Sequence, residues 1–162
     1  MNKHIERIQR SSKLGLWSSV ALAIASGLFV WISPWQFRQN ATVANGMLIA
    51  GAILAVGAVS MALLVIRKRI PQLRLTDNLD PKLQGYADHI HHLYSSLAIV
   101  VAALCAMTVL SGQSTLLMLT LVTTLMLVLA YPNMYKIKSD LGLSGDEMRQ
   151  LFGDKYLDND AQ

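Results

Sequence analysis

The side chains of this sequence whose types and spacing could support chemistry gather in one short segment, Asp88-His89-Ile90-His91-His92. In a helix, residues three or four positions apart lie on the same face, so Asp88 and His92, or His89 and His92, could converge on one ligand. Imidazole and carboxylate groups are ligands for zinc and iron. The segment therefore makes Asp88, His89 and His92 candidate metal ligands, and Asp88, His91 and His92 candidate catalytic residues.

A simpler interpretation of the same cluster is a solvated interface in which Asp88 pairs with a histidine. The sequence contains four histidines and no HExxH motif, whereas membrane hydroxylases with histidine boxes need about twice that number. Carboxylates near the C-terminus, such as Asp140, Asp146 or Glu147, could complete a metal shell. We expect the solvated interface and no cofactor, with a bound metal ion as the alternative.

The helices that position this cluster can be predicted from the segments that contain no charged residues. No Asp, Glu, Lys, Arg or His occurs between Lys13 and Arg38, between Arg38 and Arg67, or between His92 and Lys136. A helix of about 20 apolar residues crosses the hydrocarbon core of a bilayer, so these windows hold one, one and two spans. The sequence predicts an all-α integral membrane four-helix bundle, a single membrane domain over residues 1–162. The expected spans are at about 14–33, 46–66, 93–111 and 115–132, followed by a cytoplasmic tail at about 133–162.

The third helix is expected to begin well before its span. Asp80-Pro81 is typical of a helix start, with Asp80 as N-cap and Pro81 at the first helical position. Apolar residues such as Leu83, Ala87 and Ile90 follow at three- and four-residue spacing. The sequence thus predicts an amphipathic cytoplasmic extension of the third helix, and this extension carries the histidines.

A short helical tail is expected to close the chain. Pro132 should kink the helix that follows the fourth span, and Gly142 is typical of a helix stop. Ser144 and Glu147 then form a capping box for a last helix over about Gly145–Phe152. The acidic residues of this tail could fold back onto the basic segments or meet a partner.

Basic residues indicate the orientation and the partners. Every Lys and Arg except Arg38 falls on one side of the predicted topology, which places both termini in the cytoplasm, in a bacterial inner membrane. The run Arg67-Lys68-Arg69 is a candidate site for anionic lipid headgroups. We expect membrane lipids and either a second copy or another membrane protein as partners, and no nucleic acid. Four tyrosines near the cytoplasmic side are expected to form an aromatic belt: Tyr86, Tyr94, Tyr131 and Tyr135.

The composition of the spans argues against several function classes. Pumps, proton-coupled carriers and ion-selective pores usually retain ionisable groups at membrane depth, and these spans contain none. A single cysteine, Cys105, allows neither an intramolecular disulfide nor a CxxC pair. Thr120, Thr123 and Thr124 are expected to hydrogen-bond to their own helix backbone.

Small residues recur on three of the expected spans. They are Ser19, Ala23 and Gly27, then Gly51, Ala55, Ala58 and Ala62, and then Ala98, Ala102 and Ala106. Such stripes let helix backbones approach closely in lipid, either within one chain or between copies. We expect packing within the chain, and in particular that the third alanine stripe joins the third and fourth spans.

The resulting interpretation of function is a small four-span membrane protein without catalysis, a scaffold or accessory subunit acting through helix–helix and cytoplasmic-face contacts. The alternative is a membrane enzyme at the cytoplasmic interface that acts on a lipid-like substrate through Asp88, His89, His91 and His92, with or without a metal. A third hypothesis is a carrier or channel built from neutral polar groups.

Overall fold

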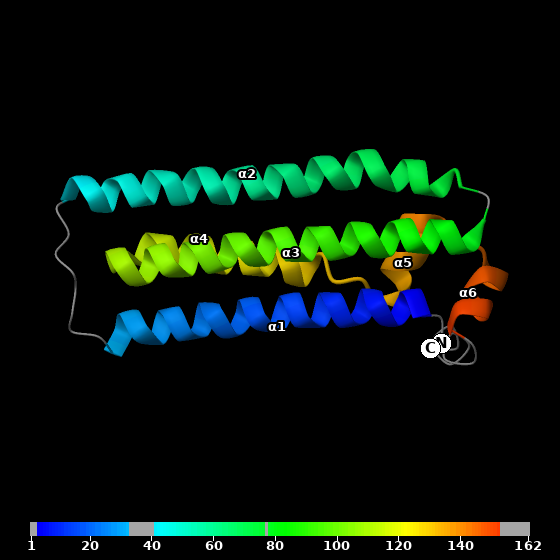
Figure 1. Cartoon of the computed structure of the whole chain (residues 1–162), viewed down its shortest axis with the longest axis horizontal. Helices are drawn as coiled ribbons and strands as arrows, with labels where there is room; N and C mark the ends of the chain where they lie inside the picture. Colours follow the sequence, from blue (N-terminus) through cyan, green and yellow to red (C-terminus); the bar gives the residue numbers. More distant parts are fainter. Residues whose placement is uncertain (1–2, 33–40, 77, 153–162) are drawn as a thin grey trace.

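The computed structural model describes residues 3–32, 41–76 and 78–152, and all regular secondary structure in these residues is helical. The three long helices, which lie side by side (Figure 1), are α1 (Lys3–Ile32), α2 (Ala41–Arg74) and α3 (Leu79–Ser111). A shorter helix, α4 (Ser114–Leu129), contacts all three of them. Two short helices, α5 (Met134–Leu141) and α6 (Gly145–Phe152), lie at the end of the molecule where α3 begins (Figure 1).

Three of these helices, α1, α2 and α3, are long and apolar enough to cross a membrane. A fourth crossing is added if α4 and α5, which meet at a bend of 77°, count as one broken span. Large apolar side chains are exposed along the long helices, for example Ile53 on α2 with 67% of its surface accessible. Such surfaces are unfavourable in water and match the hydrocarbon of a bilayer, as expected for an integral membrane protein.

The central element is α3, which is the most buried of the three long helices and contacts α1, α2 and α4. Small residues on α1 allow a close approach to it. Ser19 and Ala23 are buried, and a Cβ added to Gly15 would lie only 3.1 Å from Cδ1 of Tyr94. A Cβ added to Gly51 on α2 would lie closer still, 2.5 Å from Cδ2 of Leu116 on α4. The expected packing of small residues within the chain is therefore confirmed for α1 and for Gly51 and Ala55 of α2, whereas Ala58 and Ala62 line an open groove.

The alanine stripe on α3 does not join α3 to α4, and that prediction was wrong. Ala102 and Ala106 are exposed and line an open groove of about 550 Å³ between α1 and α3. The face of α3 that is buried carries bulkier residues, including Leu97, Val101 and Leu104. These side chains fill the space between helices, and the smaller alanines lie to one side of them.

The helix that contains the second span, α2, extends beyond the expected end of that span near residue 66. The helix continues to Arg74 with Pro71 inside it, so Arg67, Lys68 and Arg69 lie on its last turns. The next helix begins at Leu79 with Asn78 rather than Asp80 as N-cap. Asp80 instead lies in the first turn, where its charge interacts favourably with the helix dipole.

The bend between α4 and α5 contains Pro132, as expected, and partners are supplied for carbonyls at the end of α4. The Tyr94 hydroxyl donates to the Leu127 carbonyl at 2.9 Å, and Lys136 Nζ donates to the Leu129 carbonyl at 3.2 Å. The Asn133 side chain then caps α5 by accepting from the Lys136 backbone. Helix carbonyls without partners are costly in an apolar environment, so these bonds stabilise the bend.

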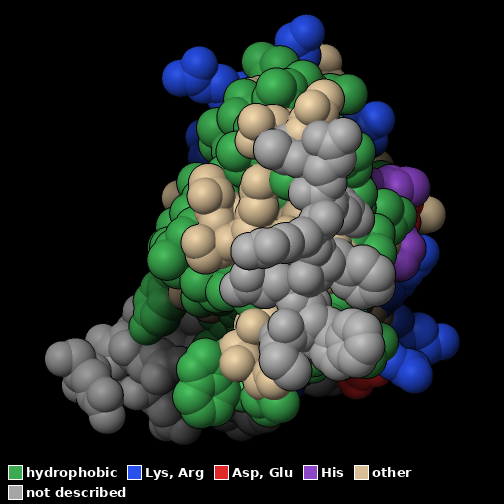
Figure 2. Space-filling view, turned by 90° about the vertical axis from the view of Figure 1, so that its left-hand side faces the viewer, with side chains coloured by type: hydrophobic (Ala, Val, Ile, Leu, Met, Phe, Trp, Pro, Cys, Tyr) green, Lys and Arg blue, Asp and Glu red, His purple; other side chains and the backbone are tan. Residues whose placement is uncertain are grey.

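We call one end of the molecule the charged end: the first turns of α1 and α3, the last turns of α2, and α5 with α6. The expected extension of α3 does not stand alone there. It shares a core with α1, α5 and α6, whose fully buried members include Ile5, Ile8, Leu83, Tyr86, Ile137, Leu141 and Met148. Among the described residues at the opposite end, Figure 2 shows mainly hydrophobic and uncharged side chains, with Lys and Arg at the rim of the view.

The expected caps of the tail are confirmed. Gly142 ends α5 in the left-handed conformation with φ 62°. The Ser144 backbone N–H donates to Glu147 Oε2 at 2.7 Å, and the Glu147 N–H donates to the Ser144 hydroxyl at 3.3 Å. The last helix covers Gly145–Phe152, and residues 153–162 lie outside the described residues.

Candidate functional site

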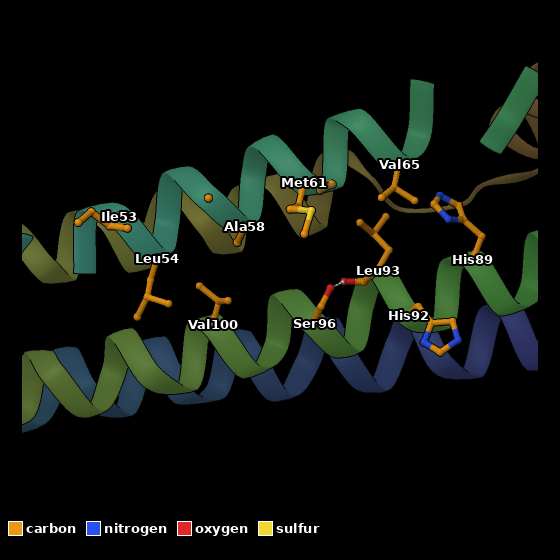
Figure 3. Close-up of a pocket in the computed structure, with 12 residues that line it drawn as sticks. Ile53, Leu54, Ala58, Met61, Val65, His89, His92, Leu93, Ser96 and Val100 are labelled. Atoms are coloured by element: carbon orange, nitrogen blue, oxygen red, sulfur yellow. Dashed lines mark hydrogen bonds between the residues drawn. The ribbon is translucent and has the colours of Figure 1, made fainter. Parts of the chain in front are cut away.

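The histidine cluster lies on the part of α3 that precedes the expected span, and its side chains point in different directions. Asp88 faces α1, where its Oδ1 lies 3.3 Å from Arg7 Nη1. His89 instead extends toward α2, beside Val65 (Figure 3). Successive side chains of a helix point about 100° apart around its axis. Asp88 and His89 therefore face different neighbours, α1 and α2, which lie on either side of α3.

The partner of Asp88 differs from the expected one. The described structure pairs this carboxylate with Arg7 rather than with a histidine. The reason is that α1 is helical from Lys3 onward and runs beside α3, which brings an N-terminal arginine to the cluster. Asp88 thus links two helices of the charged end.

The proposed metal ligands do not converge in this structure. Within residues 3–32, 41–76 and 78–152, no three His, Cys, Asp or Glu side chains form a group that could hold a metal ion. Of the carboxylates expected to complete the shell, Asp140 accepts from Tyr86 and Glu147 caps α6. The cluster therefore offers a pair of imidazoles, His89 and His92, rather than a three-ligand site.

His89 is the unusual member of the cluster. Its side chain is 3% exposed, and its Nε2 has no hydrogen-bond partner in the described part of the chain. Burial lowers the pKa of His89, and the positive charge of Arg69 lowers it further, while the Asp140 carboxylate opposes the shift. The imidazole is therefore neutral at pH 7, with one polar atom that lacks a partner. His91 and His92 are exposed, with ring centroids 5.9 Å apart.

His89 and His92 lie at one end of a groove between α2 and α3 with a volume of about 620 Å³ (Figure 3). We call it the α2–α3 groove. Its walls are almost entirely apolar, and Ser96 is the hydroxyl residue on its α3 side. An apolar groove with a few polar groups at one end has the character of a ligand site.

A second polar arrangement joins α5 to α2 and α3. The Tyr86 hydroxyl donates to Asp140 Oδ2 at 2.9 Å, and Arg74 donates to the carbonyls of Ser139 and Asp140 at the end of α5. A cation at a helix C-terminus is favourable. Burial, and then the charge of Asp140, raise the pKa of Tyr86, which therefore stays protonated as a donor.

Sequence reasoning missed this arrangement because Tyr86 and Asp140 are 54 residues apart. Tyr86 was expected in an aromatic belt, yet it is fully buried, as is Tyr94. The one available signal was the position of Tyr86 on the apolar face of its helix, four residues before Ile90. The threonines behave as expected: Thr120, Thr123 and Thr124 donate to their own helix backbone.

Comparisons with known proteins identify no relative. No family model matches the sequence, and no curated protein or solved structure matches the chain. The proposals below therefore rest on the geometry described above.

Proposed function

We propose that this chain is an integral membrane four-helix bundle that acts without catalysis, as a scaffold or accessory subunit. The α4–α5 pair supplies the fourth crossing, and the amphipathic start of α3 extends into the cytoplasm with both termini, in a bacterial inner membrane. The partners are anionic lipid headgroups at Arg67, Lys68 and Arg69, and a second copy or another membrane protein.

The observation that carries this proposal is the use of ionisable groups at the charged end. The Asp88–Arg7 pair joins α3 to α1, and the Asp140–Tyr86 hydrogen bond joins α5 to α3. These groups connect neighbouring helices around a shared apolar core. A fixed surface of this kind supports a role in binding other proteins.

The first test is the mass and metal content of the protein in mild detergent. The wild type and a variant with His89→Gln, His91→Gln and His92→Gln are compared by light scattering and elemental analysis. A scaffold should give one defined mass for both proteins. About one zinc or iron per chain, held without added metal and lost in the triple variant, would contradict the proposal and favour a metalloenzyme.

A second candidate function is an enzyme at the cytoplasmic interface that acts on a lipid-like substrate. It is favoured by the unpartnered Nε2 of His89, since a neutral imidazole at the end of an apolar groove can serve as a general base. The test is turnover of labelled phospholipid in mixed micelles. Turnover by the wild type that is lost in His89→Gln would support this second function. No turnover by the wild type would contradict it.

A further inference from the structure

The α2–α3 groove has an open apolar wall and a closed polar end. Ala58, Met61 and Val65 of α2 face Leu93 and Val100 of α3 across it (Figure 3). Beyond its polar end, Leu73 of α2 packs against Gly85 of α3, where an added Cβ would lie 2.6 Å from Leu73 Cδ2. The apolar part of the groove therefore ends at His89.

The buried His89 side chain points to a polar group on a ligand of the groove. His89 lines the groove, and its Nε2 is a buried atom without a partner in the described residues. Buried polar atoms in proteins are hydrogen-bonded as a rule, and an exception signals an absent partner. A neutral imidazole nitrogen that carries the proton would donate to an oxygen of the ligand.

Positive charge lies just beyond this oxygen site. Arg69 follows Val65 by four residues on α2, so it continues the face that lines the groove, and its charge acts on His89. Lys68 is exposed beside it. The nearby Asp140 carboxylate accepts from the Tyr86 hydroxyl and adds one negative charge, against the two positive charges of Arg69 and Lys68. The polar end of the groove is thus suited to an anion.

The length of the groove matches one leaflet of a bilayer. From His89 to Val100, α3 advances by roughly 16 Å along its axis. Half of a hydrocarbon core of about 30 Å is about 15 Å. The volume of about 620 Å³ also falls in the range of roughly 300–1,000 Å³ for ligand pockets.

We propose that the α2–α3 groove binds one acyl chain of an anionic phospholipid from the surrounding membrane. His89 donates to an ester oxygen of this lipid, and Arg69 contacts its phosphate. The site rests on the anionic headgroup contact proposed above for Arg69 and not on the scaffold role, so its failure would leave the scaffold proposal standing.

The test uses the full chain in detergent, freed of lipid, and native mass spectrometry with phosphatidylglycerol or phosphatidylcholine of identical acyl chains. The wild type should retain one phosphatidylglycerol per chain and prefer it to phosphatidylcholine by about tenfold or more in affinity. Arg69→Gln should remove this preference. His89→Phe should weaken the binding of both lipids.

A matched pair of glycine variants tests the groove itself. Gly57 lines the groove and a Cβ added to it meets nothing within 4 Å, so Gly57→Leu adds bulk to the groove without a clash. Gly46 on the same helix is equally open and lies outside the groove, so Gly46→Leu is the control. Gly57→Leu should abolish retention, and Gly46→Leu should behave as the wild type.

A second readout follows His89 directly, in case the His89→Phe variant fails to fold. The imidazole ¹⁵N resonance of His89 should shift when phosphatidylglycerol is added to the wild type, and should not shift in Gly57→Leu. Equal retention of lipid by both glycine variants would overturn the proposal. So would a Gly57→Leu variant that lowers the oligomer mass and leaves lipid retention unchanged, because the groove would then hold a helix of a second copy.

Discussion

At the scale of single residues, side chains that are neighbours in the sequence have different environments in the structure. Asp88 and His89 are neighbours in the chain, yet one is half-exposed in an ion pair with Arg7 and the other is buried and neutral. The buried histidine should therefore make the stability of the charged end depend on pH. The exposed histidines of the same cluster, His91 and His92, provide controls for substitutions of His89.

The lowered pKa of His89 predicts a loss of stability in acid. The unfolded chain takes up a proton near pH 6.5, whereas folded His89 resists protonation until a lower pH, so the free energy of unfolding falls as pH drops below about 6.5. His89→Gln should flatten this dependence in thermal unfolding between pH 7 and 5. His91→Gln should keep the wild-type slope, and a flat wild-type profile would contradict the prediction.

The Tyr86–Asp140 bond should contribute measurably to stability. Tyr86→Phe removes the donor to a partly buried carboxylate, and hydrogen bonds to charged groups are worth about 1.5–3 kcal/mol, so a loss of that size is expected in chemical unfolding. Asp140→Asn and the double variant complete a mutant cycle. Losses that simply add would show that the two side chains are not coupled.

At the scale of helices, close contact and open surface alternate along α2. Gly51 lies where α2 meets α4, and an added Cβ would come within 2.5 Å of Leu116 Cδ2. Gly46 on the same helix faces open space. Ala102 on α3 is exposed as well, although its spacing is that of a packed stripe.

Because these positions differ in how closely neighbouring side chains surround them, a leucine should destabilise the protein by different amounts. Gly51→Leu should destabilise the protein by about 1–3 kcal/mol through overpacking, measured by thermal unfolding in detergent. Gly46→Leu and Ala102→Leu should have little effect, because neither site is enclosed. A large loss in Ala102→Leu would indicate that α1 and α3 close over this residue.

At the scale of the whole molecule, positive charge gathers at one end. The start of α1, the end of α2 and the short helices α5 and α6 carry basic residues and lie together (Figure 1). The charged end also has an apolar core of its own, beside the histidines. Basic residues next to membrane spans are typically retained in the cytoplasm.

This distribution predicts the orientation in the membrane. A fluorescent protein that matures only in the cytoplasm should be bright when fused after Gln162, and an alkaline phosphatase at the same point should be inactive. A matched fusion in the turn after α3, at Gln113, should give the reverse pattern, since α3 separates the two ends. A dark fluorescent fusion and an active phosphatase fusion after Gln162 would show that the topology is the inverse of the predicted one.

The sequence by itself determined the helical class, the apolar spans and the caps of the tail, whereas the N-cap of α3 is Asn78 and not the predicted Asp80. Charge-free windows, Gly142 and the Ser144–Glu147 box depend only on residues close in the chain, so they could be predicted. Tertiary structure alone decided that Asp88 meets Arg7, that Tyr86 meets Asp140 and that Ala102 is exposed. These outcomes depend on how helices rotate and on which helix lies beside which, and those choices follow from the packing of side chains far apart in the sequence.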